Sequence, residues 1–160
     1  MATSVWIPES KTKIESFLWL RPAPRFQVGI AHLWKQNSYR ILMNTVLVSE
    51  SKGIPTLRIG AGVQESLTGN PGYFGIAEKH FSIANGSLHL FSGVGFRSNE
   101  NHGHPVAGFK FSPTKNFTFG FQSDGHWDNA FVAKTDKEFT ITLYLIDLEM
   151  FGIGLSWAKF

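Results

Sequence analysis

Residues 139–160, FTITLYLIDLEMFGIGLSWAKF, alternate between two kinds of side chain. One set is bulky and apolar and resumes after a turn at 147–149: Phe139, Ile141, Leu143, Leu145, Phe151, Ile153, Leu155 and Trp157. The other set is small or polar and almost free of charge: Thr140, Thr142, Tyr144, Gly152, Gly154, Ser156 and Ala158. A period of two predicts a half-buried β-hairpin. The exposed face of a soluble sheet normally carries Lys and Glu, so the missing charge sets this hairpin apart.

The same alternation recurs over most of the chain. Strand-length segments lie between turn signals from Phe26 onward, and shorter pieces precede them at 4–8 and 13–20. The segment YFGIAEKHF, 73–81, is an exception, because Glu78, Lys79 and His80 place polar groups on both faces. We predict one all-β domain over residues 1–160, a closed antiparallel up-and-down barrel of about 12 strands, or about 10 if the N-terminal pieces pair poorly.

Composition favours a barrel that lies in lipid. Charged residues make up 17% of the chain, against roughly 25% in ordinary soluble domains. No window approaches the ~20 apolar residues that a membrane helix requires. In a transmembrane β-barrel the apolar face contacts lipid and the polar face lines the lumen, whereas a soluble lipocalin-like barrel would hold an apolar ligand inside. We favour the transmembrane barrel, because charges concentrate in the turns and a sheet in lipid must close.

The polar face of the alternating strands supplies candidates for the lumen lining. Glycines on this parity are expected to leave space for water. Cations among these residues would make the lumen weakly anion-favouring, or they would form ion pairs with acidic residues such as Glu78. The predicted lumen-lining residues are Arg58, Gln64, His89, Arg97, Lys110 and Gln122.

Two loops offer weak candidates for metal ligands. SNENHGH contains His102 and His104, and SDGHWD contains Asp124 and His126. Imidazole and carboxylate groups bind transition metals, but solvated loop tips explain these residues better, so no metal site is predicted. A hydrolase site that combines His80, His89 and Ser82 is also disfavoured, because nothing in their spacing activates the serine.

No cofactor and no nucleic-acid partner are predicted. The chain has no cysteine, no phosphate-binding loop and no dinucleotide fingerprint. Its net charge of +3 is mild and comes without a basic cluster.

The residues resemble bacterial outer-membrane β-barrels, and more narrowly the YjbH-like barrels associated with exopolysaccharide genes. Five segments between Met43 and Phe160 carry this resemblance: SESKGIPTLRIGAGVQ, TGNPGYFGIAEKHF, LFSGVGFRSN, HPVAGFKFSPTKNFTFGFQSDG and LSWAKF. The resemblance implies export and assembly in the outer membrane by a machinery that reads a terminal aromatic residue in many such barrels. Phe160 departs from this pattern, because it shares the parity of Gly152 and Gly154 and not that of Trp157. Its role as an assembly signal is therefore left open.

We therefore expect a non-enzymatic protein of the bacterial outer membrane whose export signal is absent from this chain. Its expected partners are the lipid bilayer, or detergent, and the outer-membrane assembly machinery. It would serve as a narrow passive pore or as a membrane-embedded accessory of envelope or polysaccharide export. The connections at 147–149, 123–126, 98–103 and 65–72 would face outward. Aromatic girdles at the lipid–water interface would comprise Trp19, Trp34, Tyr39, Tyr73, Trp127 and Trp157.

Overall fold

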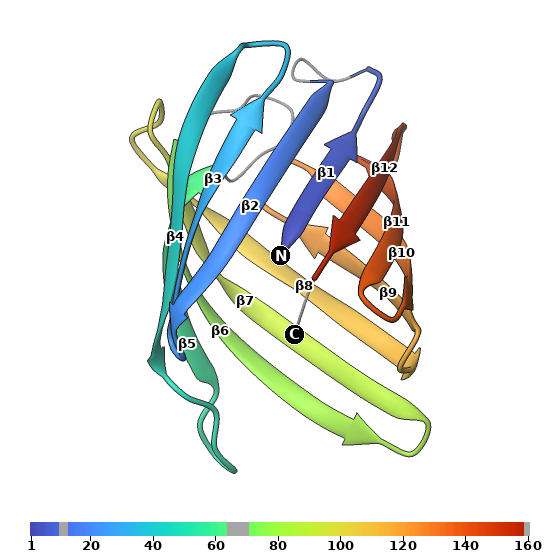
Figure 1. Ribbon diagram of the computed structural model, residues 1–160. Coiled ribbons are helices and arrows are strands. Elements are labelled where there is room, and N and C mark those ends of the chain that lie inside the picture. Colours follow the sequence, from blue (N-terminus) through green and yellow to red (C-terminus); the bar gives the residue numbers. More distant parts are fainter. Residues whose placement is uncertain (10–12, 64–70, 159–160) are drawn as a thin grey trace.

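The computed structural model describes residues 1–9, 13–63 and 71–158, which form one closed antiparallel sheet (Figure 1). Each strand pairs with the next along the chain, and the first strand closes the barrel against the last. The predicted closed up-and-down barrel of 12 strands is confirmed. Its strands are β1 (Ala2–Trp6), β2 (Ile14–Ala23), β3 (Phe26–Leu33), β4 (Ser38–Val48), β5 (Thr56–Val63), β6 (Pro71–Ile83), β7 (Gly86–Arg97), β8 (Gly103–Thr114), β9 (Phe117–Ser123), β10 (Asp128–Asp136), β11 (Phe139–Ile146) and β12 (Met150–Trp157).

No helix among the described residues is long and apolar enough to cross a membrane.

The last hairpin forms as its alternation predicts. Leu143 on β11 lies opposite Ile153 on β12, and every residue pair from Phe139 to Ile146 keeps this register. The turn places Asp147 and Leu148 at φ values of 51° and 55°, and the Glu149 N–H donates to the Ile146 carbonyl at 3.1 Å. Two left-handed residues in a row give a turn whose twist matches that of the strands. The two faces therefore stay in phase on both strands.

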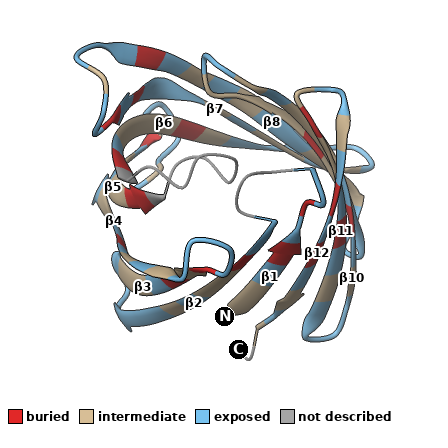
Figure 2. Ribbon diagram, turned by 90° about the horizontal axis from the view of Figure 1, so that it is seen from above, coloured by how far each residue is buried: buried red, intermediate tan, exposed pale blue. Residues whose placement is uncertain are grey.

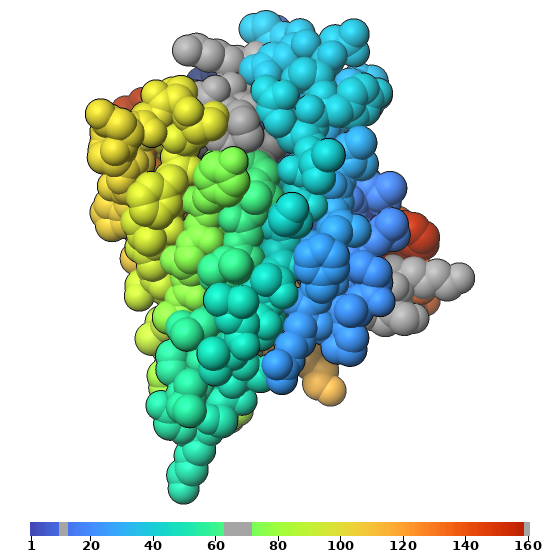
Figure 3. Space-filling model, turned by 90° about the vertical axis from the view of Figure 1, so that its left-hand side faces the viewer, coloured from blue at the N-terminus to red at the C-terminus, as the bar shows by residue number. Residues whose placement is uncertain are grey.

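Large apolar side chains cover the outside of the barrel. Ile41 is 77% exposed and Phe151 is 74% exposed. Figure 3 shows part of this outer surface, over β4 to β7. The buried apolar side chains of the described residues are few and belong to the inner parity: Val5, Ile7, Ala31, Leu33, Leu42, Ala133 and Ile146. A lipocalin-like barrel would have the opposite arrangement, with its main apolar face inside.

The inner face is less open than its glycines suggest. Aromatic rings lie over inward-facing glycines of the neighbouring strand and occupy the space that a side chain there would fill. A Cβ atom at Gly120 would lie 2.7 Å from the Phe131 ring, and one at Gly29 would lie 3.0 Å from the Trp19 ring. The expectation that these glycines only leave space for water needs correction, because they also accommodate rings against the barrel wall. The cross-strand pairs are Trp19 with Gly29, Phe74 with Gly60, Phe91 with Gly108, and Phe131 with Gly120.

An apolar cluster fills one side of the interior. Val5, Ile7 and Ile146 are buried, and four partly buried side chains pack against them: Phe17, Trp127, Tyr144 and Met150. The girdle prediction is wrong for two residues, because Trp127 and Trp19 line the interior. The other four are exposed, as the girdle prediction requires: Trp34, Tyr39, Tyr73 and Trp157.

Side-chain hydrogen bonds and ion pairs link the loop after β4 to the extended β6–β7 hairpin. β5 begins at Thr56, which pairs with Glu78, so the residues of β6 after Glu78 have no partner on β5. The Glu50 carboxylate accepts the backbone N–H of His80 at 3.2 Å, and its Oε2 lies 2.7 Å from His80 Nδ1. Lys79 Nζ donates to the Ser51 carbonyl at 2.6 Å. These contacts hold the 49–55 connection at the barrel end that carries the termini.

This contact predicts a pH-dependent stability. The hydrogen bond from His80, helped by Lys79 and opposed by burial, holds the pKa of the Glu50 carboxyl below its ordinary value of 4.5. A carboxyl with a lowered folded-state pKa stabilises the fold above its unfolded pKa and loses this contribution as the pH falls through the folded value. We expect Glu50→Gln to lower the thermal unfolding temperature in detergent at neutral pH, and the difference from wild type to shrink below pH 4.5. Glu9→Gln, at an exposed residue of the β1–β2 connection, is the control. A difference that persists in acid would contradict this role of Glu50.

Candidate functional site in the barrel lumen

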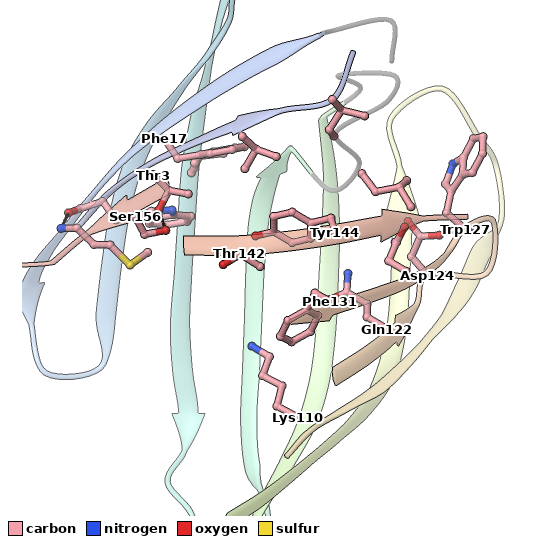
Figure 4. A pocket seen from close by; sticks show the side chains of 17 residues that line it. Thr3, Phe17, Lys110, Gln122, Asp124, Trp127, Phe131, Thr142, Tyr144 and Ser156 are labelled. Carbon is pink, nitrogen blue, oxygen red and sulfur yellow. Dashed lines mark hydrogen bonds between the residues drawn. The ribbon is translucent and has the colours of Figure 1, made fainter. Parts of the chain in front are cut away.

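The barrel encloses a cavity of about 480 Å³. Figure 2 looks along the barrel into the lumen, and Figure 4 shows the side chains that line this cavity. β1, β2, β4 and β8 to β12 contribute to it, together with the β9–β10 connection. Polar and apolar groups alternate around its wall, and the polar ones are Thr3, Lys110, Gln122, Asp124, Asn129, Thr142, Tyr144 and Ser156. The space is suited to water and a small polar solute.

Lys110 supplies a cation to this cavity. It lies on the inner face of β8, opposite His89 on β7 and Gly120 on β9. Its ammonium group points into the cavity, beside Phe131 and below Thr142 (Figure 4). Lys110 makes no ion pair with any other described residue. Its charge is thus available to an anion that enters the lumen.

Arg58 is neutralised by Glu78. Arg58 Nε donates to Glu78 Oε1 at 2.7 Å, and Nη2 donates to Oε2 at 3.4 Å. Arg58 Nη1 also donates to Asn44 Oδ1 at 3.2 Å, while His89 Nε2 lies 3.5 Å from Glu78 Oε2. This network joins the inner faces of β4, β5, β6 and β7. Arg58 therefore forms the ion pair that the sequence offered as the alternative to a free lumenal cation.

Arg97 is paired as well. Its side chain is 9% exposed at the end of β7, with Nη1 3.5 Å from Glu100 Oε1 and Nη2 3.6 Å from Asp124 Oδ2. The Asp124 carboxylate also accepts the backbone N–H groups of His126 and Trp127, at 3.0 and 2.9 Å. Of the three cations predicted for the lumen, Lys110 is thus the one whose charge no described carboxylate neutralises.

The structure places two of the three other predicted lumen residues on the inner face. Gln122 lines the cavity from β9, and His89 lies on the inner face of β7 next to the Arg58–Glu78 pair. Gln64 lies outside the described residues. Sequence reasoning missed several lining groups, namely Asn129, Phe131, Thr142 and Tyr144. Their inward parity is visible in the sequence, but which inward groups share one cavity depends on the register between strands.

The histidines proposed for a hydrolase site do not form one. His80 stacks on His89, with ring centroids 4.2 Å apart and planes inclined by 3°. Ser82 lies farther along β6, opposite Ser87, and makes no hydrogen bond with either histidine among the described residues. A nucleophile requires its base within hydrogen-bond reach. The described geometry therefore gives this arrangement no support.

Two of the four weak metal candidates, His104 and His126, come together. His104 Nε2 and His126 Nε2 are 3.0 Å apart, and Glu100, which the sequence analysis did not single out, contacts both. His102 lies beside His104, with ring centroids 4.5 Å apart. Asp124 fixes the backbone of the turn that carries His126. Only the position of Glu100 four residues before His104 could have signalled its part in the cluster.

Comparison with known proteins finds a solved structure with a similar fold. No protein-family model matches the chain. No curated protein matches it either. A solved structure described as a KdgM porin matches over 99% of this chain and 98% of its own, with a TM-score of 0.63 and 14% sequence identity. At this identity the likeness shows a shared barrel fold. The narrower resemblance to YjbH-like barrels stays a prediction.

Proposed function

We propose that this chain is a bacterial outer-membrane β-barrel that forms a narrow, non-enzymatic pore. One observation carries the proposal: the closed 12-strand sheet has its large apolar side chains outside and a cavity of about 480 Å³ inside, whose wall includes polar as well as apolar side chains. An outward apolar wall matches lipid, and closure satisfies the backbone hydrogen bonds that lipid leaves unpaired. The porin-like fold of the solved structure described above supports the same function.

The lumen should pass small solutes slowly. General porins leave a wide aqueous channel with about 16 to 18 strands, so a barrel of this size is narrower. The inward rings and the cluster around Ile7 narrow it further. Lys110 then gives the cavity a mild preference for anions, because Arg58 and Arg97 are paired with carboxylates. Small anions are the solute class that this arrangement suits.

Other functions receive less support. A soluble lipocalin-like barrel is not favoured, because the apolar outer wall of this chain would then face water. The role as an accessory of polysaccharide export rests on the sequence resemblance, and nothing in the described structure favours it over a pore. The assembly role of the C-terminus concerns Phe160, which lies outside the described residues.

Recording in planar lipid bilayers tests the pore. We expect the refolded chain to give small conductance steps and a reversal potential in a KCl gradient that indicates mild anion preference. Lys110→Glu should shift this potential toward cations, because it reverses the charge that this residue contributes to the cavity. Lys115→Glu changes the net charge equally in the exposed β8–β9 turn and should leave the potential nearly unchanged. Conductance no greater than that of a protein-free bilayer would overturn the proposal.

A further inference from the structure

Three potential metal ligands converge at one mouth of the barrel. Glu100 lies in the β7–β8 connection, His104 near the start of β8, and His126 in the β9–β10 connection. Two strands separate these connections, so both lie at the barrel end opposite the termini. The side chains of His104 and Glu100 are 10% and 18% exposed, and that of His126 is 34% exposed. The cluster is thus partly shielded but reachable from the mouth.

The spacing of the ligand atoms suits a tetrahedral metal ion. The Glu100, His104 and His126 ligand atoms all lie within 4.8 Å of one another. The two histidine Nε2 atoms are 3.0 Å apart, His126 Nε2 is 3.6 Å from Glu100 Oε2, and this oxygen also contacts His104 Nε2. In a tetrahedral site with bonds of about 2.0–2.1 Å, ligand atoms are separated by about 3.3 Å. Shifts of a few tenths of an ångström would bring the first two distances to this value.

The surrounding residues hold the ligands in place. Asp124 accepts the His126 N–H at 3.0 Å and so fixes the turn that presents this histidine. Gly125, at φ 82°, lets the turn approach β8, because a Cβ atom there would lie 2.9 Å from the His104 Cβ. Arg97 contacts the Glu100 oxygen that faces away from the histidines. Outer groups of this kind orient metal ligands in proteins.

The local charge also favours a cation. Two carboxylates, Glu100 and Asp124, surround the single guanidinium of Arg97. A metal ion near the facing Nε2 atoms of His104 and His126 would accept a lone pair from each. Two imidazole nitrogens and one carboxylate oxygen form a donor set typical of zinc and related transition metals, with a further position for water.

We propose that Glu100, His104 and His126 bind one divalent transition-metal ion of the Zn²⁺ class at the mouth of the barrel. The ion would join the β7–β8 and β9–β10 connections across β8 and β9. None of the three ligands lines the Lys110 cavity, and the site requires the barrel fold but no conductance through it. Failure of the pore proposal would therefore leave the metal proposal intact.

Isothermal titration of the refolded, tag-free and metal-stripped protein with ZnCl₂ tests the site. We expect one ion per barrel in the wild type and loss of this binding in the double variant His104→Ala/His126→Ala. Glu100→Gln should weaken binding at least about tenfold, because it replaces a charged ligand. His80→Ala removes a histidine near the opposite end of the barrel and should leave the affinity unchanged. Electrophoresis with and without heating shows whether each variant has folded.

A second measurement identifies the ligands directly. CoCl₂ should give the intense visible absorption of a four-coordinate ion in the wild type and in His80→Ala but not in the double variant. Zn²⁺ should also raise the unfolding temperature of the wild type, because it binds the folded state. The proposal is overturned if the folded wild type binds no Zn²⁺ stoichiometrically, or if the folded double variant binds it with the same affinity.

Discussion

Leu143→Arg is expected to lower the free energy of unfolding in phospholipid vesicles by about 2–4 kcal/mol, the cost of an arginine on the lipid face near the bilayer midplane. Leu143 lies in the middle of β11, opposite Ile153 on β12 and Val132 on β10, and is 53% exposed on the outer face. In water an exposed Leu→Arg change usually stays within about 0.5 kcal/mol. Equilibrium unfolding with urea, followed by tryptophan fluorescence, measures the difference.

Leu148→Arg is the matched control. Leu148 is also 53% exposed, but it lies in the β11–β12 turn, beyond the strands. An arginine there can stay hydrated, so we expect its effect to remain within about 0.5 kcal/mol. Equal, small effects at both positions would show that the outer wall does not lie in hydrocarbon. The pair separates a transmembrane barrel from a soluble one without relying on conductance.

The strands could be predicted because their outward-facing residues must be apolar, and this requirement appears at every second position of the sequence. Every second residue on β11 and β12 is large and apolar, whatever its neighbour on the next strand. β6 breaks this rule, and its faces could not be assigned from the sequence. Its last residues extend beyond β5, where Lys79 contacts the 49–55 connection instead of the apolar wall. Polar groups are therefore tolerated on both faces there.

The interior was less predictable, because its contacts depend on register between strands. Alternation places Phe131 on the inner face, but its contact with Gly120 depends on the β9–β10 pairing. Similarly, the loop histidines His104 and His126 were recognisable as metal-binding residue types. Their convergence with Glu100 requires the β7–β8 and β9–β10 connections to meet beside β8. Arg58 forms an ion pair with Glu78, whereas Lys110 does not. Which of the two cations lies within reach of Glu78 also depends on the register between strands.

Glu78→Gln is the second change for which we expect a large effect. Glu78 carries the carboxylate that bonds to Arg58 and lies near His89, and its side chain is 8% exposed. The variant keeps the size of the side chain but leaves the guanidinium of Arg58 without its counter-charge. Removal of one partner from a buried ion pair costs about 3–5 kcal/mol, and water in the lumen should keep the loss near the lower limit. The same urea titration in vesicles measures it.

The double variant Arg58→Met/Glu78→Leu separates two causes of this loss. If the unpaired guanidinium is responsible, the double variant should recover most of the stability, because apolar side chains of similar size replace such pairs at little cost. Glu9→Gln, which also removes a negative charge but at an exposed site, should change stability by less than about 0.5 kcal/mol. A similarly small effect of Glu78→Gln would contradict a structural role of the ion pair.

The same substitution has a consequence for the pore that stability does not report. Glu78→Gln frees the charge of Arg58 inside the barrel, so Arg58 joins Lys110 as a cation of the inner face without a carboxylate partner. The reversal potential should shift toward anions, opposite to the shift expected for Lys110→Glu. An unchanged potential in a folded, conducting Glu78→Gln barrel would place the Arg58 pair away from the path of the ions. The ion pair would then stabilise the wall without contributing to the selectivity.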